Sequence, residues 1–148
     1  NVIYTVDPSD PNDISLGERV RKANKYSSQD AIFVSIHNNA VGKTGTASGF
    51  EIFTTPGQNN SDKLAESIYN EVAKLYNKIN LKLRYDLSDK DHDKEAGFYV
   101  IKGANMPAVL IECLFFDNYN DYTKLKDKIF IESLANAIYL GIQNYIKQ

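Results

Sequence analysis

The sequence predicts a single α/β domain with a mixed, mostly parallel sheet of about five or six strands and helices on both of its faces. Short apolar runs rich in β-branched residues, at 31–36 and 108–111, are typical of buried strands. Longer segments repeat apolar residues at helical spacing, at 61–79 and toward the C-terminus. With 148 residues, 43% of them hydrophobic, the chain is long enough for one domain with a substantial core.

The first third of the chain predicts a strand, a helix and two further strands. Residues 2–6 have the composition of a strand, so the chain begins inside one. Ser15 with Glu18 three residues later forms a capping-box pattern, and the helix that starts there continues to Tyr26. After the strand at 31–36, a small and flexible loop leads to a strand at 50–54.

The second half predicts two long helices and two strands. Ser61 can cap the helix that ends at Ile79. Strands at 98–101 and 108–111 are joined by a link too short for a crossover helix, so they are either antiparallel neighbours or not adjacent. A closing helix begins at Lys124 or Lys128 and carries an apolar stripe to its end.

The most charged segment, residues 84–97, contains one of the two histidines, His92. Alternating aspartates there are compatible with calcium, but the glycine and the final glutamate of an EF-hand are not at their required spacings. We therefore expect a solvated loop, with a lid or a substrate-contacting loop as the alternative.

Composition excludes several classes of partner. The net charge of −2 provides no attraction to nucleic acid or to anionic lipid, so neither is expected as a partner. No apolar run reaches the roughly 18 residues of a membrane helix. A single cysteine, Cys113, excludes an internal disulfide and a zinc site built on several thiolates.

Two polar side chains follow apolar strands and suggest a common site. His37 comes after the strand at 31–36, and Glu112 comes after the strand at 108–111. If the two strands are parallel, both side chains lie at the same edge of the sheet, where open α/β sheets bind ligands. The alternatives are a core histidine bonded to a backbone carbonyl and a glutamate paired with Lys or Arg.

Several motifs together identify a family. They are Leu16-x-x-Arg19, Ser35-Ile36-His37-Asn38-Asn39-Ala40, Gly49-x-Glu51, Met106-Pro107-Ala108-Val109-Leu110-Ile111-Glu112 and Phe116-x-Asn118. In this order and spacing, the chain resembles the zinc-dependent N-acetylmuramoyl-L-alanine amidases of the type-3 family. The resemblance covers nearly the whole chain.

The resemblance implies a site and a reaction. His37 matches a ligand of Zn²⁺ and Glu112 matches the catalytic glutamate. Asn39 would orient His37 or the substrate, and Glu51 would support the site. The implied substrate is peptidoglycan, and the bond cleaved joins N-acetylmuramic acid to L-alanine of the stem peptide. Such an enzyme acts on the bacterial cell wall, either secreted or encoded by a phage as an endolysin or a virion component.

The chain differs from the family in its set of zinc ligands. Family members supply two earlier zinc ligands, a histidine after the first strand and a glutamate at the start of the first helix, and neither is present in 1–148. We therefore expect residues 1–148 to be an amidase catalytic domain that is N-terminally incomplete relative to the family. The alternatives are an inactive wall-binding or virion structural module, and a rebuilt site that combines His37 with His92 or with Asp89, Asp91 or Asp93.

A cysteine hydrolase is the rival enzyme class, since Cys113 follows an apolar strand and the chain contains two histidines. Adjacent strand residues point to opposite faces, so a Glu112 that faces the site predicts a Cys113 that faces the core. The sequence therefore disfavours a thiol nucleophile.

Overall fold

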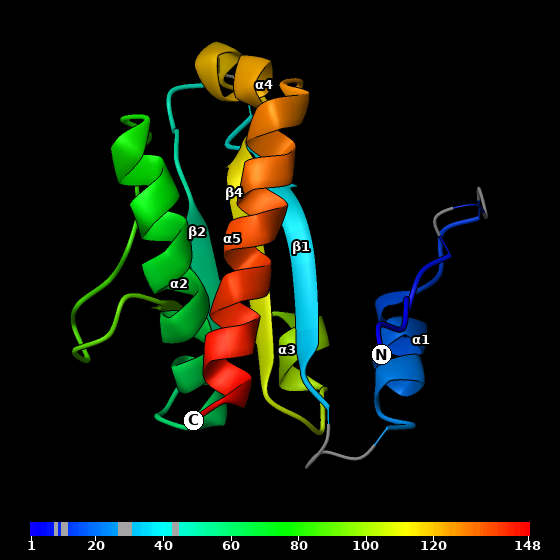
Figure 1. Cartoon of the computed structure of the whole chain (residues 1–148). Coiled ribbons are helices and arrows are strands. Elements are labelled where there is room, and N and C mark those ends of the chain that lie inside the picture. Colours follow the sequence, from blue (N-terminus) through cyan, green and yellow to red (C-terminus); the bar gives the residue numbers. More distant parts are fainter. Residues whose placement is uncertain (8, 10–11, 27–30, 43–44) are drawn as a thin grey trace.

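The structure is a computed structural model that describes residues 1–148 except 8, 10–11, 27–30 and 43–44 (Figure 1). Its elements are, in chain order, α1 (Leu16–Ala23), β1 (Phe33–Asn39), β2 (Glu51–Thr54), α2 (Asn60–Lys78), β3 (Lys94–Glu95), α3 (Tyr99–Lys102), β4 (Ala108–Phe115), α4 (Tyr119–Leu125) and α5 (Lys128–Ile146). None of the helices in the described ranges has the length and apolar character needed to cross a bilayer.

The sheet has the strand order β1-β4-β2-β3. β1 pairs with β4 in parallel, β4 pairs with β2 antiparallel, and β2 pairs with β3 in parallel. The predicted α/β class with a mixed sheet is confirmed, and the sheet formed by the described residues has four strands rather than five or six. β4 is the central strand, and seven of its eight residues are buried, as its continuous apolar sequence predicts.

Helices α2 and α5 cover one face of the sheet, side by side across β4 (Figure 1). This face holds the larger core cluster. It contains Val109, Ile111 and Cys113 of β4 and apolar residues of both helices, among them Leu64, Ile68, Val72, Leu134 and Ile138. Residues of β4 at every second position thus point into this core.

The opposite face is covered only in part. There α3 packs against the beginning of β1 and β4, in a second cluster that includes Phe33, Val100, Ile101, Ala108 and Leu110. α1 lies beyond α3, away from the sheet (Figure 1). None of the helices in the described ranges therefore lies over the later part of β1 and β4 on this face.

Two predicted strands are wrong. Residues 2–6 form no strand, and Val2 and Tyr4 are 82% and 72% exposed, because no strand among the described residues pairs with them. Residues 98–101 are also not a strand. Val100 and Ile101 are both buried on the same side, which one turn of helix achieves and an extended chain does not.

Helix starts follow side-chain caps. Of the capping box predicted at Ser15 and Glu18, the N-cap half is confirmed, since Ser15 Oγ accepts from Glu18 N at 3.2 Å. For α2 the cap is Asn59 rather than the predicted Ser61, because Asn59 accepts from Ser61 N while Asp62 accepts from Asn59 N. The closing helix begins at Lys128, the later of the two predicted starts, and α4 precedes it.

The contact between α2 and α5 depends on Gly141. A Cβ added there would overlap the backbone of Ile68 and approach Ser67 O to 2.8 Å. We predict that Gly141→Ala lowers the free energy of unfolding by about 1–3 kcal/mol, because two helices would have to separate. Urea unfolding followed by circular dichroism measures this change.

Gly17→Ala is the matched control, since it places the same methyl group in α1. The nearest atom to that Cβ would be Tyr99 Oη at 3.5 Å, an ordinary contact. Because alanine has the higher helix propensity, we expect a neutral or stabilising effect of up to about 1 kcal/mol. Equal destabilisation by both substitutions would show that the helix contact is not the cause.

Candidate active site

Three polar side chains lie in one row across three adjacent strands. His37 of β1 is paired in register with Glu112 of β4, and Glu51 of β2 is paired with Glu112 from the other side. Directly paired residues project from the same face of a sheet. The two strands are parallel, which is the condition under which the sequence placed His37 and Glu112 in one site.

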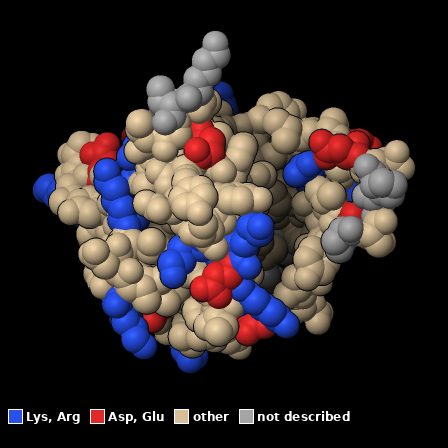
Figure 2. Space-filling view, turned by 90° about the horizontal axis from the view of Figure 1, so that it is seen from above, with Lys and Arg blue, Asp and Glu red and all other residues tan. Residues whose placement is uncertain are grey.

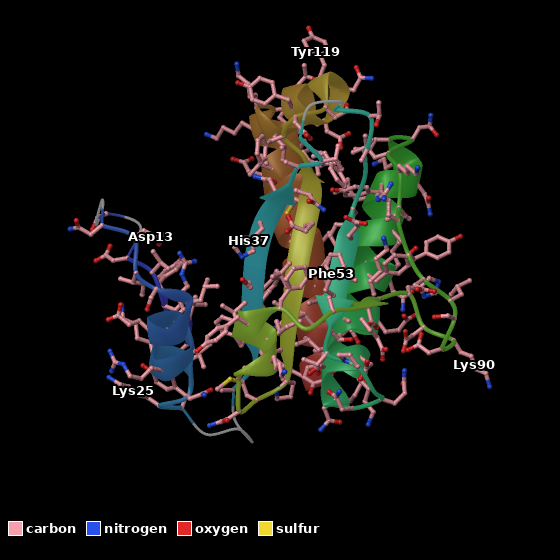
Figure 3. All side chains as sticks on the ribbon, turned by 180° about the vertical axis from the view of Figure 1, so that it is seen from behind. Asp13, Lys25, His37, Phe53, Lys90 and Tyr119 are labelled. Atoms are coloured by element: carbon pink, nitrogen blue, oxygen red, sulfur yellow. The ribbon has the colours of Figure 1, made fainter. Side chains whose placement is uncertain are left out.

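The row lies on the face that α2 and α5 do not cover. Val109, Ile111 and Cys113 point into the core, so Glu112 points to the other side. Figure 3 views this face, where His37 projects from β1 on the side of α1. Figure 2 shows that the surface is hollowed between the α1 segment and the rest of the molecule.

The two key residues lie within their strands, where the sequence predicted them just after the strand ends. β1 continues for two residues beyond His37, and β4 continues for three residues beyond Glu112. Both side chains therefore stand on the surface of the sheet, held by backbone pairing on at least one side. Such positions are more rigid than loop positions.

Glu112 is half-buried, and one of its carboxylate oxygens has no partner among the described residues. Its Oε2 atom is buried and accepts no hydrogen bond. Burial raises the pKa of Glu112 to about 7, and the charge of Glu51 adds to the rise. A carboxylate with this pKa can take up a proton and release it near neutral pH, as a general acid or base requires.

Glu51 has the opposite environment. It is 5% exposed, yet it accepts from Lys94 Nζ at 2.6 Å and from Arg84 Nε at 3.0 Å. Burial alone would raise the pKa of Glu51, but the hydrogen bonds and charges of Lys94 and Arg84 outweigh it, so its pKa lies below the usual range. Glu51 therefore stays ionised beside Glu112.

Asn39 contacts Glu51 rather than His37. Its Nδ2 donates to Glu51 Oε2 at 2.7 Å, and its Oδ1 accepts from Ala40 N. Glu51 thus has a donor on each carboxylate oxygen. This network explains how a carboxylate with 5% exposure is tolerated inside the sheet.

His37 is held as a neutral imidazole. Burial lowers the pKa of His37, and the nearby charge of Arg19 lowers it further. Ser35, on the same face of β1, places Oγ 2.6 Å from His37 Nε2 and so restrains the ring. A neutral imidazole is the form that binds a metal ion.

The described residues do not complete a zinc site at His37. Structural and catalytic zinc sites use at least three protein ligands. Within the described ranges, the only group of three potential ligands in reach of one another is Asp62, Asp91 and Asp93, and it does not include His37. His92 instead pairs with Glu66 at 3.0 Å and stacks on Tyr69.

The alternative of a rebuilt metal site, in which His37 would combine with His92 or with an aspartate of 84–97, is therefore wrong. Among the described residues, His37 forms no group of three potential ligands with them. The cysteine hydrolase is also disfavoured as predicted. Cys113 is 6% exposed in the core, and burial raises the pKa of its thiol to about 12.

Three residues of the site were not predicted from the sequence: Ser35, Arg84 and Lys94. Arg84 and Lys94 belong to the segment predicted as a solvated loop, but both ion-pair with Glu51. The available signal was Glu51 itself. A carboxylate between Phe50 and Ile52, which are 0% and 1% exposed, requires cationic partners from elsewhere in the chain.

The contrasting environments of the two glutamates give a pH prediction for the metal-free chain. The folded pKa of Glu112, about 7, lies above its ordinary value of 4.5, so the unfolded chain releases this proton first as the pH rises. The contribution of Glu112 to the free energy of unfolding is fully present below pH 4.5 and is lost as the pH rises to about 7. Glu112→Gln removes this loss, and between pH 5 and pH 8 it should retain about 1–2 kcal/mol more than the parent in urea unfolding.

Glu51→Gln should have the opposite effect. The pKa of Glu51 is depressed, so its ionised form stabilises the fold above its unfolded pKa. The amide leaves Lys94 and Arg84 without their carboxylate, and we expect a loss of about 2–4 kcal/mol at pH 7. Similar losses in the Glu51→Gln and Glu112→Gln chains would contradict the assignment of the two environments.

Comparison with known proteins gives the same family from sequence and from structure. The sequence profile of N-acetylmuramoyl-L-alanine amidase matches residues 1–144. The chain is 38% identical over 136 residues to the N-acetylmuramoyl-L-alanine amidase LytC of Bacillus subtilis, covering 90% of this chain and 25% of LytC. It is 30% identical over 128 residues to the endolysin of Bacillus phage SPP1, covering 84% of this chain and 43% of the endolysin.

A solved N-acetylmuramoyl-L-alanine amidase from Clostridium difficile 630 superimposes with a TM-score of 0.80 at 28% identity, covering 95% of this chain and 69% of that one. The chain spans less than half the length of the two named relatives. Because the profile match extends over nearly all of its residues, the chain belongs to the N-acetylmuramoyl-L-alanine amidase family.

Proposed function

We propose that this chain is part of the catalytic domain of a peptidoglycan hydrolase, which cleaves the amide between N-acetylmuramic acid and L-alanine of the stem peptide. The family membership and the names of the relatives support the reaction class. The observation that carries the proposal is the row of His37, Glu112 and Glu51 on the uncovered face of the sheet.

Glu112 acts as the proton carrier. Hydrolysis requires a base that takes a proton from the attacking water and then gives it to the leaving nitrogen as the C–N bond breaks. The buried Oε2 without a partner leaves room for a hydrogen bond to that water. The pKa of about 7 supports both halves of the proton transfer near neutral pH.

Glu51 is a positioning residue in this proposal. Its fixed negative charge, held by Lys94 and Arg84, raises the pKa of the neighbouring Glu112. Asn39 holds the second oxygen of Glu51. We assign Asn39 and Glu51 to the support of Glu112, with substrate contact by Asn39 as a further role.

Zn²⁺ is the proposed cofactor, with His37 as one ligand and further ligands from outside residues 1–148. The neutral, half-buried imidazole suits a ligand, but the described residues do not supply the rest of the set. A bound zinc ion would polarise the amide carbonyl and acidify the attacking water. In this proposal residues 1–148 are an N-terminally incomplete amidase domain.

A second candidate is an inactive amidase-like module that binds peptidoglycan or serves as a virion structural part. The incomplete ligand set at His37 favours it. Either candidate places the protein at the bacterial cell wall, whether a bacterium secretes it or a phage encodes it. The relatives include both kinds of protein.

Metal content separates the two candidates. We predict about one zinc per chain in a longer form that carries the N-terminal family segment, and much less than one in residues 1–148 alone. Elemental analysis with intact mass on the same sample measures both. Stoichiometric zinc in residues 1–148 would contradict external ligands, and a zinc-free longer form would favour the inactive module.

His37→Ala in the longer form is the matching variant. Removing one of three ligands should lower zinc affinity strongly, so zinc should be lost during dialysis against a weak chelator. Full retention of zinc by this variant would remove His37 from the ligand set.

Glu112→Gln in the longer form tests the catalytic role. We predict a loss of about 10²–10⁴ in kcat with little change in KM, because a general acid–base group contributes that much. New amino groups released from purified peptidoglycan report the rate. Glu132→Gln, on the exposed surface of α5, is the control and should be unchanged. Turnover by Glu112→Gln at the parent rate would contradict the catalytic role of Glu112.

A further inference from the structure

Three aspartates converge at the beginning of α2, away from the row of His37 and Glu112. Asp62 comes from the first turn of α2, while Asp91 and Asp93 come from the loop before β3. One carboxylate oxygen of each lies within 4.8 Å of the others. Asp93 is 1% exposed and Asp62 is 5% exposed, while Asp91 is partly exposed, so two of the three carboxylates are buried rather than on a solvated loop.

The hydrogen bonds around these aspartates do not satisfy them. Thr54 Oγ1 lies 2.5 Å from Asp93 Oδ2 and 3.3 Å from Asp62 Oδ1, but a hydroxyl has a single proton and can donate to one of them at a time. Asp93 Oδ1 is buried with no hydrogen-bond partner, and so is Asp91 Oδ1. Two oxygens of the cluster therefore lack a donor.

The charges are also uncompensated. Two basic side chains of the same loop are engaged elsewhere, since Lys94 pairs with Glu51 and His92 pairs with Glu66. Within the described part of the chain, no ion pair joins Asp62, Asp91 or Asp93 to a Lys, Arg or His. This contrasts with Glu51, a buried carboxylate that receives two cations.

A buried carboxylate without a cation must gain a proton or a metal ion. Burial raises the pKa of Asp93 to about 7, and the charges of Asp91 and Asp62 contribute. Protonation therefore relieves the cluster in mildly acidic solution. Above pH 7 a bound cation is the remaining way to offset three converging negative charges.

We propose that Asp62, Asp91 and Asp93 bind a divalent cation of the calcium type, which ties the loop before β3 to the start of α2. The donors are all carboxylate oxygens, which hard cations prefer and which differ from the nitrogen and sulfur ligands typical of zinc. Two ligands of one Ca²⁺, at about 2.4 Å each, lie at most about 4.8 Å apart. The three carboxylate oxygens fall within this limit of one another.

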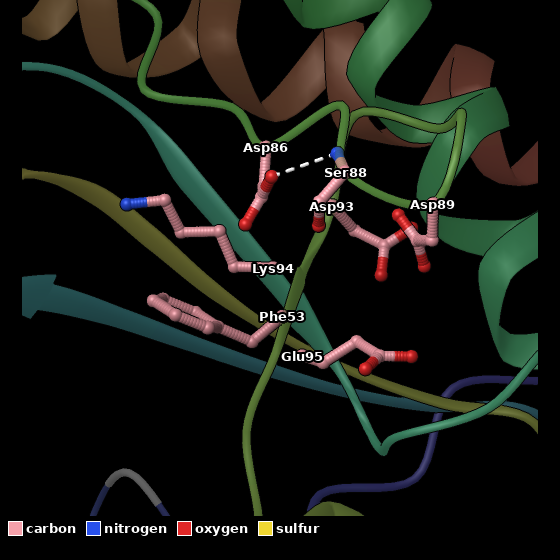
Figure 4. A pocket seen from close by; sticks show the side chains of 7 residues that line it. All are labelled: Phe53, Asp86, Ser88, Asp89, Asp93, Lys94 and Glu95. Carbon is pink, nitrogen blue, oxygen red and sulfur yellow. Dashed lines mark hydrogen bonds between the residues drawn. The ribbon is translucent and has the colours of Figure 1, made fainter.

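The surroundings leave a route for the ion and its water ligands. A hollow of about 430 Å³ adjoins the cluster and is lined by Phe53, Asp86, Ser88, Asp89, Asp93, Lys94 and Glu95 (Figure 4). Asp93 thus belongs both to the cluster and to the hollow. Four of the seven lining residues are acidic, which favours the entry of a cation.

This inference is independent of the proposed hydrolase function, and its test needs no enzyme activity. We expect the EGTA-treated chain to bind one Ca²⁺ in equilibrium dialysis at pH 8. At a free concentration about 100 times the Kd, the midpoint of thermal unfolding should rise by about 5–10 °C. Asp93→Asn and Asp91→Asn should each abolish this rise.

Two variants serve as matched controls. Asp86→Asn changes a carboxylate of the same loop that lines the hollow, accepts from Ser88 N and lies outside the cluster, so it should keep the full calcium response. His37→Ala should also keep it. Loss of the response in His37→Ala would assign the calcium to the other site and overturn the proposal.

The dialysis on the parent chain gives a result that does not depend on the folding of any variant. No Ca²⁺ bound at 10 mM and pH 8 would overturn the proposal and leave protonation as the means by which the cluster is satisfied. A calcium response that persists in a folded Asp93→Asn chain, checked by circular dichroism, would also overturn it. If the proposal holds, Asp93→Asn should be more stable than the calcium-free parent at this pH, because it removes an uncompensated charge.

Discussion

The register of β4 between β1 and β2 is the constraint on which the site depends. Pairing places His37 and Glu51 on either side of Glu112, on one face of three neighbouring strands. The alternation of β4 simultaneously directs Ile111 and Cys113 into the core beneath α2 and α5. A slip by one residue would place Glu112 in that core and its apolar neighbours on the open face, so the packing of the core also fixes the chemistry.

The same row contains two carboxylates whose surroundings differ. Glu51 is almost completely buried but receives Lys94, Arg84 and Asn39, so its charge is stabilised. Glu112 receives no donor at Oε2 and has the charge of Glu51 beside it. Separated pKa values in one cluster are typical of acid–base sites. The unsatisfied carboxylate costs stability, which is common at functional positions.

The sequence allowed the central parts of the fold and the two main site residues to be predicted. The apolar run before Glu112 and the motif around His37 are local signals of two strands, and the condition that would bring the two residues together, a parallel arrangement of these strands, is met. Two elements could not be predicted locally. Residues 2–6 have strand composition but no partner strand among the described residues, and 98–101 are apolar residues that pack as a helical turn over Phe33 and Leu110. Arg84 and Lys94 join the site through contacts over 33 and 43 positions of sequence, which no local pattern encodes.

The loop before β3 links the two acidic regions of the molecule. Asp93 is the last residue before β3 and Lys94 is its first residue, and their side chains contact different groups. Asp93 turns toward Thr54 and the start of α2, while Lys94 turns toward Glu51. Whatever offsets the charge of Asp93 therefore also holds the backbone that presents Lys94 to Glu51. Since Glu51 in turn sets the electrostatic environment of Glu112, the acidic cluster is connected to the candidate active site through a single pair of neighbouring residues.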